Sequence, residues 1–351
     1  MGRPGVKLDR LATWKTVSKA DMAGIASGIG AKNKNIETAY ASRVPLEHRK
    51  RYAQFFTPSD AADLMADWVL QYKPAKVLDP AIGTGVLARA LLQRKPKTQI
   101  DGFDIDPLIA EVAKAAMSNH AKNVHIVLGD FLDHDPDQKY KAIIANPPYL
   151  RHHDLDDAPQ RIAEISGRLG INLSRLTNSY GIFLLDCCHR LEPRGRLAFI
   201  IPTEWTNANF GDAIKSYLLE NGLLKYLIYT CNSSTVFDDA LTTACILLIE
   251  KPAEHGTNEE ITTLFVPEEK KLPTLTQLTA DEIRSDNRIF IRKFKKEVLL
   301  AVPKWDSIIR RGVVDIPSGF VSLRELASTK RGIATGANSY FHISNRAALE
   351  W

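Results

Sequence analysis

From Arg51 to Glu250 the sequence alternates short runs rich in β-branched residues with longer stretches of helical periodicity. This alternation is typical of a parallel sheet whose strands are joined by crossover helices. The expected strands are Lys76–Asp79, Gln99–Asp104, His125–Leu128, Lys141–Ala145, Arg196–Ile201, Leu224–Tyr229 and Cys245–Glu250. The expected helices are Asp60–Tyr72, Gly85–Arg94, Leu108–Ser118, Tyr180–Leu191 and Phe210–Asn221. This order predicts one α/β domain on a seven-stranded sheet, with ligand-binding residues where the strands end.

The composition is that of an ordinary globular protein. The 351 residues are 44% hydrophobic and 25% charged, which allows one large core and a smaller module. No apolar run approaches the roughly 18 residues that cross a bilayer, and the amino terminus lacks the apolar stretch of a secretory signal. We therefore expect a cytoplasmic protein without a membrane partner. The four cysteines have no metal-ligand spacing and are expected to be reduced and packed.

Charge is distributed unevenly along the chain. Residues 1–51 carry a net charge of +7, residues 52–260 carry −7, and residues 261–351 carry +5. Basic ends around an acidic middle indicate that the ends contact a polyanion, although solvated surface charge is the simpler alternative. We expect a basic helical segment over 1–50, the α/β domain over 51–251, and a basic region over 259–351. In that last region the stretch Arg288–Arg311 is amphipathic, with Phe290, Phe294 and Trp305 interleaved.

A glycine-containing loop follows the first expected strand. Its glycines allow a ligand to approach the backbone closely, and the amino terminus of the next helix favours an anionic group such as a carboxylate. The loop lacks the third glycine of the dinucleotide fingerprint and the Lys-Ser/Thr of a P-loop, which disfavours pyrophosphate and triphosphate ligands. Its residues are Asp79-Pro80-Ala81-Ile82-Gly83-Thr84-Gly85.

Two further carboxylates end the next two expected strands. Asp104 lies 21 residues after Gly83, where an acidic side chain can accept hydrogen bonds from both hydroxyls of a ribose. Asp130 can accept from an adenine amino group, while Phe131 or Ile105 packs on the ring. Each carboxylate alone is equally well a cap or turn residue. Together they fit adenosine carrying a small zwitterion, which is S-adenosylmethionine.

The sequence Asn146-Pro147-Pro148-Tyr149 follows the fourth expected strand and suits the methylation of a conjugated amino group. The Asn146 side-chain oxygen and the Pro147 carbonyl can accept from the two N–H bonds of such a group, which frees the nitrogen lone pair for attack. Pro147 and Pro148 hold these acceptors rigidly. Tyr149 offers a flat face for an extruded base. A simple strand-ending loop is the alternative.

With Gln54-Phe55-Phe56-Thr57-Pro58 upstream, these motifs stand in the order found in the gamma-order DNA adenine methyltransferases of type II restriction–modification systems. The resemblance extends from about Arg51 to Lys251. It implies a Rossmann-like seven-stranded methyltransferase sheet with helices on both faces, S-adenosylmethionine as cofactor, and no metal. It also implies methyl transfer to the N6 amino group of a flipped adenine in double-stranded DNA. A cognate restriction endonuclease would then be the functional partner.

The same resemblance assigns roles to particular residues. The segment Phe56-Thr57-Pro58 would lie against the methionine end of the cofactor, and Asp79 near its amino group. Asp104 and Asp130 match the ribose and adenine ligands of the family. Phe237, in Val236-Phe237-Asp238, matches an aromatic residue that stacks on the target base beside Tyr149. A buried hairpin aromatic is the alternative for Phe237.

The chain also departs from the family pattern. Ala53 stands where a glycine is common, and Ile82 replaces a frequent cysteine. Relatives usually continue into a long target-recognition domain, for which residues 259–351 provide only the linker and beginning. The segment Arg331–Asn338 resembles the opening of that domain. The expectation is either a shortened chain or recognition by a separate protein.

Several alternatives remain open at this point. A modification subunit that needs a separate specificity protein would contain the same motifs. RNA methyltransferases and protein-glutamine methyltransferases also use an Asn-Pro-Pro tetrapeptide, and cytosine-N4 methylation is chemically close. His152-His153-Asp154 is better explained as a loop beside the substrate than as a metal site, because adjacent side chains do not readily chelate one ion. The recognition sequence, strand preference and oligomeric state are not encoded in these motifs.

Overall fold

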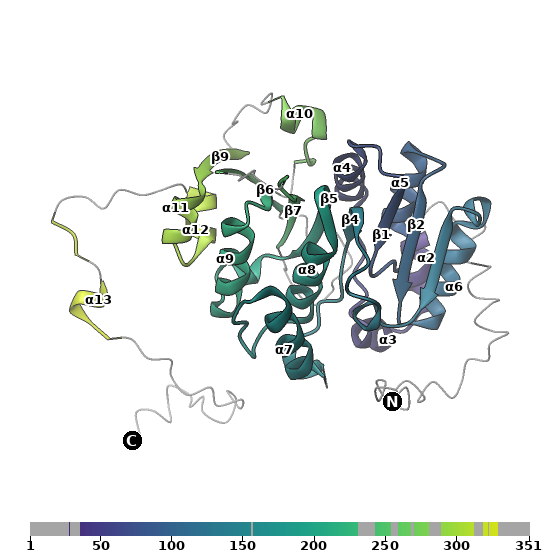
Figure 1. Ribbon diagram of the computed structural model, residues 1–351, viewed down its shortest axis with the longest axis horizontal. Helices are drawn as coiled ribbons and strands as arrows, with labels where there is room; N and C mark the ends of the chain where they lie inside the picture. Colours follow the sequence, from purple (N-terminus) through teal and green to yellow (C-terminus); the bar gives the residue numbers. More distant parts are fainter. Residues whose placement is uncertain are drawn as a thin grey trace, which may run out of the picture. The chain divides into compact units, whose positions relative to one another are not determined.

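The computed structural model describes Gly28 and residues 36–155, 157–230, 243–253, 259–267, 270–280, 289–311, 319–321 and 323–328. The chain divides into two units, residues 1–312 and residues 313–351. A mixed nine-stranded sheet with the order β3-β2-β1-β4-β5-β7-β6-β8-β9 forms the centre of the first unit (Figure 1). Its strands are β1 (Lys76–Asp79), β2 (Gln99–Asp104), β3 (Val124–Leu128), β4 (Tyr140–Ala145), β5 (Leu191–Pro202), β6 (Leu224–Thr230), β7 (Ala244–Glu250), β8 (Glu260–Val266) and β9 (Phe290–Lys295).

Helices cover both faces of the sheet. One face packs against α7, α8 and α9 in the largest apolar cluster, and the opposite face packs against α4, α5 and α10. At the amino-terminal side α2 packs on α6 through a small separate cluster. The helices of this unit are α2 (Ile36–Arg43), α3 (Leu46–Arg51), α4 (Ser59–Leu70), α5 (Val86–Arg94), α6 (Pro107–Ala116), α7 (Ala158–Leu169), α8 (Ser179–Arg190), α9 (Asp212–Glu220), α10 (Leu275–Thr279), α11 (Lys296–Ala301) and α12 (Trp305–Arg311). In the second unit the described helix is α13 (Leu323–Leu326).

The α/β architecture and all seven expected strands are confirmed, but the expected strand number is wrong. Two more strands, β8 and β9, extend the sheet beyond β6, with β8 parallel to β6 and β9 antiparallel to β8. They come from the region 259–351, which the sequence analysis assigned to DNA contact. The polar threonines of β8 obscured a strand whose Ile261 and Leu264 are buried.

The aromatic residues of the basic stretch are also packed differently from an exposed binding surface. Phe294 and Trp305 are buried, and the Trp305 indole lies edge-on to Trp205 with ring centroids 5.7 Å apart. Its N–H donates to the Leu299 carbonyl at 2.9 Å. These residues therefore stabilise the packing of α11 and α12 on the sheet instead of offering rings to a nucleic acid.

Helix α7 is absent from the sequence-based prediction. The helix begins with Pro159 in its first turn and ends at Gly170, whose φ of 66° is left-handed and stops the helical path. Proline near the start and glycine just past the end are helix signals that the sequence does contain.

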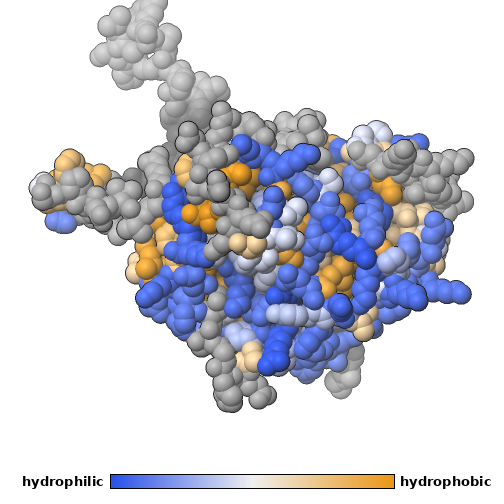
Figure 2. Space-filling view, turned by 90° about the horizontal axis from the view of Figure 1, so that it is seen from above, coloured by the Kyte–Doolittle hydropathy of each residue, from blue (hydrophilic) through white to orange (hydrophobic). Residues whose placement is uncertain are grey.

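The surface and the cysteines are those of an ordinary globular protein. Viewed from above, the described surface is mostly hydrophilic with scattered apolar residues (Figure 2). Cys187, Cys188 and Cys245 are buried and free, and burial raises the pKa of the last two thiols to about 12. Cys231 lies outside the described residues. Among the helices that the structure describes, none is long and apolar enough to span a membrane.

Candidate functional site

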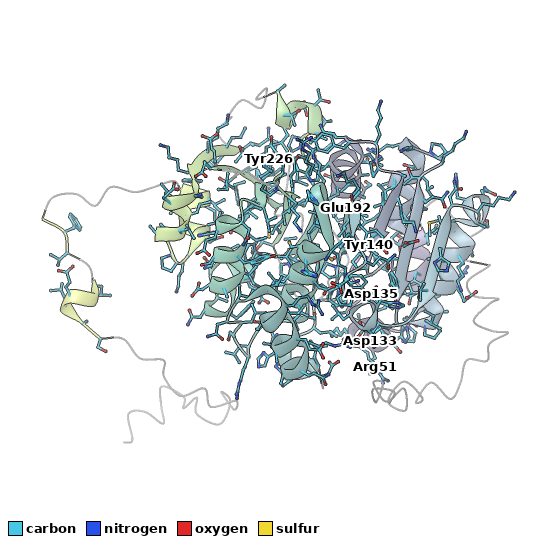
Figure 3. The ribbon with its side chains drawn as sticks, in the orientation of Figure 1. Arg51, Asp133, Asp135, Tyr140, Glu192 and Tyr226 are labelled. Carbon is cyan, nitrogen blue, oxygen red and sulfur yellow. The ribbon has the colours of Figure 1, made fainter. Side chains whose placement is uncertain are left out.

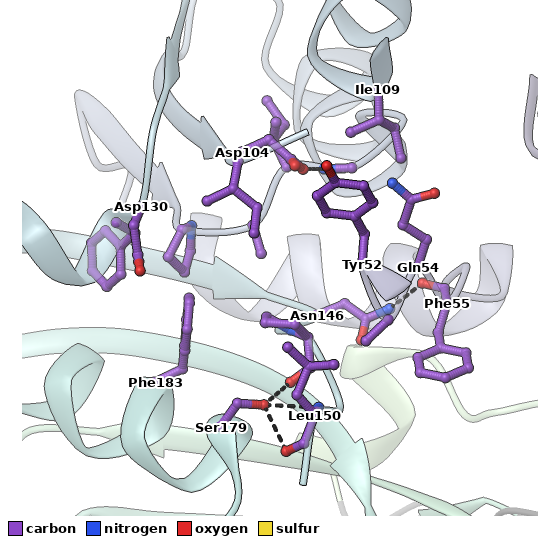
Figure 4. A pocket seen from close by; sticks show the side chains of 18 of the residues that line it. Tyr52, Gln54, Phe55, Asp104, Ile109, Asp130, Asn146, Leu150, Ser179 and Phe183 are labelled. Atoms are coloured by element: carbon purple, nitrogen blue, oxygen red, sulfur yellow. Dashed lines mark hydrogen bonds between the residues drawn. The ribbon is translucent and has the colours of Figure 1, made fainter. Parts of the chain in front are cut away.

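The sequence motifs meet in one open-sided pocket at the edge of the sheet where β1, β2 and β4 end (Figure 4). Its empty volume is about 1100 Å³, including space that is open to solvent. The walls come from the segment before α4, the glycine loop after β1, the ends of β2, β3 and β4, and helices α7 and α8. The edge position is the one expected for a ligand site in an open α/β sheet.

Most of the predicted site residues line this pocket. These are Phe56, Thr57, Pro80, Ala81, Gly83, Asp104, Ile105, Asp130, Phe131, Asn146 and Pro148. Pro58, Asp79, Gly85, Pro147 and Tyr149 are chain neighbours of lining residues but are not part of the wall. Phe237 lies outside the described residues. The wall also contains residues without a predicted role, including Phe55, Asp157, Arg161, Ser179 and Phe183.

The Asn146 amide is held in one orientation by the segment before α4. Its Nδ2 donates to the Phe55 carbonyl at 2.8 Å and to the Thr57 hydroxyl at 3.1 Å (Figure 4). Its Oδ1 accepts from the Tyr149 hydroxyl at 2.6 Å. Because a carbonyl oxygen has two acceptor sites, Oδ1 keeps one for a further donor. The upstream motif and the tetrapeptide, nearly 90 residues apart in sequence, thus form one hydrogen-bonded unit.

The start of α8 supports the chain that follows Pro148. The Ser179 hydroxyl donates to the Pro148 carbonyl, and its oxygen accepts from the Leu150 N–H at 2.9 Å. The Ser179 N–H donates to the Leu150 carbonyl at 3.0 Å. No donor within the described part of the chain is bonded to the Pro147 carbonyl. Both predicted acceptors, Asn146 Oδ1 and the Pro147 carbonyl, therefore keep acceptor capacity on a braced loop.

Tyr149 stacks against a protein ring. Its ring lies parallel to Phe55, with centroids 4.9 Å apart and planes at 21°, and Tyr180 approaches edge-on at 6.3 Å. The Ile200 carbonyl lies 3.2 Å from the same hydroxyl and is the alternative acceptor for its one proton. Burial raises the pKa of the phenol, so Tyr149 stays protonated near neutral pH. A phenol in this state donates a hydrogen bond and does not act as a base.

Asp104 lies beside the glycine loop with both oxygens already oriented. Its Oδ2 accepts from the Gly83 N–H at 3.0 Å, and its Oδ1 accepts from the Asp106 N–H at 2.9 Å. Burial raises the pKa of Asp104 to about 7. Gly83 has a left-handed φ of 55°, which favours glycine at this turn.

Asp79 is completely buried beneath the pocket and keeps one unused oxygen. Its Oδ1 accepts from the Ala81 N–H at 3.3 Å, while Oδ2 has no partner among the described residues. Burial raises the pKa of this carboxyl to about 8. A buried acceptor without a donor is costly, and an amino group arriving beside Ala81 would satisfy it.

Asp130 lies at the far end of the pocket. Its Oδ1 accepts from the Leu132 N–H at 2.9 Å, and its Oδ2 accepts from the Arg161 guanidinium at 3.3 Å. Ile105 is 42% exposed toward this region, whereas Phe131 is only 2% exposed, with the Arg190 guanidinium 4.4 Å above its ring. Of the two residues expected to pack on an adenine ring, Ile105 has the available surface.

A buried carboxylate joins the amino-terminal helices to the pocket. The Asp106 side chain accepts from the Gln54 amide at 2.6 Å and lies 2.7 Å from Nε2 of His48. Tyr40 of α2 donates to the oxygen of the Gln54 amide at 2.9 Å. This cluster fixes the segment that orients Asn146, so helices α2 and α3 act on the site through Gln54.

Both departures from the family pattern have local explanations. Ala53 has a left-handed φ of 48°, a conformation that glycine adopts without strain, which explains why glycine is common at this position. The Ile82 side chain packs directly over Gly102 of β2, where any side chain on Gly102 would collide with it. Neither residue removes a polar group from the pocket.

The carboxylates at this site are spread along the pocket. Asp104 and Asp130 are part of its wall, and Asp79 lies buried behind the glycine loop. Separated acceptors of this kind suit S-adenosylmethionine, whose amino group, ribose hydroxyls and adenine amino group are all donors. No three metal-ligating side chains converge anywhere in the described ranges. The segment His152–Asp154 is a short 3-10 helix in which His153 and Asp154 are 3.6 Å apart and exposed.

Comparison with known proteins places this geometry in a family. A family model described as N-6 DNA Methylase matches residues 41–315. Type II methyltransferase M.AccI of Acinetobacter calcoaceticus is 36% identical over 324 residues, covering 91% of this chain and 58% of that protein. M.XamI of Xanthomonas campestris pv. amaranthicola is 28% identical, covering 84% and 54%. A tRNA1(Val) (adenine(37)-N6)-methyltransferase of Aliivibrio salmonicida is 31% identical over 143 residues, covering 40% and 57%.

The chain spans a little over half the length of these relatives. Solved structures give the same fold at low identity. The methyltransferase subunit of a type I restriction-modification system from Streptococcus thermophilus superposes with a TM-score of 0.56 at 16% identity, covering 76% of this chain and 64% of that one. A putative class I S-adenosylmethionine-dependent methyltransferase from Listeria monocytogenes gives 0.53 at 16% identity, covering 74% and 88%. With its motifs, its fold and a family match over most of its length, the chain belongs to the N-6 DNA methylase family.

Proposed function

We propose that this protein transfers a methyl group from S-adenosylmethionine to the N6 amino group of an adenine flipped out of double-stranded DNA. The observation that carries the proposal is the orientation of Asn146. Its Nδ2 is engaged by Phe55 and Thr57, so its Oδ1 is the atom left to accept from an incoming amino group. Family membership supports the same reaction.

The cofactor is held by side chains that already have their orientation. Asp104 would accept from the ribose hydroxyls, Asp130 from the adenine amino group, and the free oxygen of Asp79 from the methionine ammonium. Ile105 would pack on the adenine ring, and Phe56-Thr57-Pro58 would flank the methionine end. When bound, S-adenosylmethionine supplies an electrophilic methyl group on a positively charged sulfur.

The target amino group is activated by acceptors. Asn146 Oδ1 and the Pro147 carbonyl accept from its two N–H bonds, which localises the lone pair on nitrogen and favours the developing positive charge. The residues hold the amino group in line and exclude competing orientations. No strong base is needed, because the nitrogen becomes acidic after alkylation and water can take the proton.

The flipped base would use the ring of Tyr149, with Phe237 as its second aromatic neighbour. In the described structure Phe55 covers one face of Tyr149 at stacking distance. A base that stacks on that face must displace the Phe55 ring, which exchanges one aromatic contact for another. Unstacking a base from the duplex costs a few kcal/mol. Because the Phe55–Tyr149 contact is lost, stacking on Tyr149 offsets less of this cost than stacking on a ring without a neighbour would.

The biological setting is proposed from the relatives. Several are type II methyltransferases, so the partner would be a restriction endonuclease that cuts the same unmethylated sequence. Residues 259–351 would contribute DNA contacts and the beginning of target recognition, beyond the part that forms β8 and β9. The alternative is a modification subunit that depends on a separate specificity protein. Measurements of the size of the protein with and without DNA would distinguish it from a self-sufficient enzyme.

A transfer assay on several substrates tests the reaction. The protein is incubated with radiolabelled S-adenosylmethionine and either DNA lacking adenine methylation, bulk tRNA or protein, and the products are hydrolysed and separated. Label in N6-methyladenine from DNA supports the proposal. The tRNA arm is included because one relative is a tRNA adenine-N6 methyltransferase. Label confined to tRNA, protein or N4-methylcytosine would replace the proposal by the corresponding activity.

A further inference from the structure

Arg161 of α7 is a buried cation at the end of the pocket where Asp130 lies. Its side chain is 11% exposed, and it is part of the pocket wall. One guanidinium contacts three carboxylates: Nε donates to Asp157 at 2.9 Å, and one terminal nitrogen donates to Asp133 at 2.6 Å and to Asp130 at 3.3 Å. Asp133 lies on the loop that also carries Asp130 (Figure 3).

The three carboxylates have different settings. Asp133 is about half exposed and Asp157 about one-third exposed, so water can solvate both. Asp130 and Asp157 both form part of the pocket wall, and Asp130 is the less exposed of the two. Asp133 therefore holds Arg161 from the solvent side, while the contacts of Arg161 with Asp130 and Asp157 lie at the pocket.

We propose that Arg161 is a positioning residue that makes the pocket select an adenine ring over a hypoxanthine ring by holding Asp130 as an ionised acceptor. The inference rests on the proposed cofactor site and adds to it the residue that determines its purine specificity. Arg161 acts through Asp130 and need not touch the bound nucleoside.

The selection follows from the hydrogen-bond inventory of Asp130. An ionised carboxylate only accepts, and with two oxygens it has about four acceptor positions. The Leu132 N–H and the Arg161 guanidinium use one position on each oxygen, leaving room for the N–H of an adenine amino group. Hypoxanthine presents a carbonyl oxygen at the same position. Two acceptors then face each other, unless the carboxyl is protonated and donates.

The surroundings of Asp130 make this protonation state depend on Arg161. Burial raises the pKa of Asp130, and the nearby negative charges of Asp133 and Asp157 raise it further, whereas the Leu132 N–H and Arg161 lower it. These are the charged groups that act on Asp130 within the described structure. Without Arg161 the neutral carboxyl gains population, and a neutral carboxyl tolerates the hypoxanthine carbonyl.

A purely structural role for Arg161 predicts something different. Arg161 also joins α7 to the loop after β3, so its loss could loosen the pocket and weaken every ligand equally. The ratio of the affinities for the adenine and the hypoxanthine compound separates a selective role from a structural one. A loosened pocket wall weakens binding of both compounds and leaves this ratio unchanged. Arg168 provides a matched control on the same helix: it pairs with the buried Asp186 and is absent from the pocket wall.

The experiment compares Arg161→Met, Arg161→Lys and Arg168→Met in the full chain. Equilibrium dissociation constants are measured by calorimetry for S-adenosylhomocysteine and for its inosine analogue, which differ in the purine 6-substituent and in the proton that hypoxanthine carries on the neighbouring N1. The wild-type protein and Arg168→Met are expected to prefer the adenine compound strongly. Arg161→Met is expected to lower that preference about tenfold or more, the effect of one charge-assisted hydrogen bond in a buried site. Arg161→Lys keeps the charge and should retain an intermediate preference.

The possible results separate the role of Arg161 from the existence of the cofactor site. Equal weakening of both ligands in Arg161→Met, with the preference unchanged, would overturn the role of Arg161 while leaving the cofactor site intact. A wild-type protein that binds neither ligand would instead count against the cofactor site itself. If Arg161→Met does not fold, Arg161→Gln, which keeps hydrogen-bond donors but removes the charge, decides: a preference equal to that of Arg168→Met overturns the proposal, and a reduced one supports it.

Discussion

Replacing Asn146 by alanine should abolish most turnover while leaving cofactor binding nearly unchanged. The substitution removes Oδ1, one of the two acceptors proposed for the target amino group. A dipole aimed at charge that develops in the transition state contributes about 3 kcal/mol, by analogy with the donors of oxyanion holes. The rate of methyl transfer should therefore fall about a hundredfold or more.

The same substitution has a separate cost in stability that the structure also determines. The Phe55 carbonyl and the Thr57 hydroxyl lose the Nδ2 donor, whereas the Tyr149 hydroxyl keeps the Ile200 carbonyl. A hydrogen bond contributes about 1 kcal/mol net, so the loss of these two should lower the free energy of unfolding by roughly 2 kcal/mol. Loss of turnover must therefore be measured well below the lowered melting temperature.

Single-turnover transfer of radiolabel to DNA gives the rate, and calorimetry gives the dissociation constant for S-adenosylmethionine. Asn123→Ala is the matched control, because the Asn123 amide likewise donates to a backbone carbonyl, that of Pro96 at 2.7 Å, but lies outside the pocket wall. It should turn over normally. Turnover of Asn146→Ala within about threefold of the wild type would refute the mechanism, and so would a loss of cofactor affinity large enough to explain the loss of rate.

Three further substitutions test other parts of the account. Tyr149→Ala should slow methylation of a paired adenine more than of a mispaired one, because only the first must be unstacked; equal losses in single-turnover assays would exclude a stacking role. The pKa of Asp104 is about 7, so cofactor affinity measured by calorimetry should rise from pH 6 to pH 8 as this acceptor ionises. Asp104→Asn should bind about tenfold more weakly and show a smaller pH dependence over this range, to which Asp79 also contributes. The folded-state pKa of Asp79 is about 8, above its unfolded value near 4, so its contribution to stability is present at low pH and disappears as pH rises toward 8. Asp79→Asn should flatten the decline in melting temperature between pH 5 and pH 8, and an unchanged slope would contradict the buried, protonated assignment.

The edge of the sheet was predictable because its residues follow strand ends. Asp104, Asp130 and Asn146 each come directly after an apolar run, and the carboxyl ends of parallel strands meet at one edge. That geometry depends only on the local pattern and on the chirality of the crossovers. The three side chains therefore lie where the sequence placed them.

The interactions among these residues were not predictable in the same way. The bond from Asn146 to Thr57 and the contact of Arg161 with Asp130 join elements whose separation in sequence carries no periodic signal. The stacking of Phe55 on Tyr149 has the same character. Such contacts depend on how helices and loops pack over the sheet, which pattern reasoning does not resolve.

The miscounted strands have a related cause. Strand β8 carries two consecutive threonines, and three of the six residues of its neighbour β9 are basic, so neither has the continuous apolar run of a central strand. Both lie toward one edge of the sheet, where a half-exposed strand tolerates polar side chains. The basic residues of β9 suggested a nucleic-acid surface when only the sequence was considered. In the structure Phe294 of the same strand is buried in the core.

The central claim is that Asn146 activates the N6 amino group of adenine in DNA. Its most direct test is nucleoside analysis of DNA incubated with radiolabelled S-adenosylmethionine and either the wild-type protein or Asn146→Ala, at equal cofactor occupancy. We expect label in N6-methyladenine with the wild type and at least a hundredfold less with the variant, because Asn146 Oδ1 contributes about 3 kcal/mol to the transition state. Label in another nucleoside, or equal N6-methyladenine from both proteins, would contradict it.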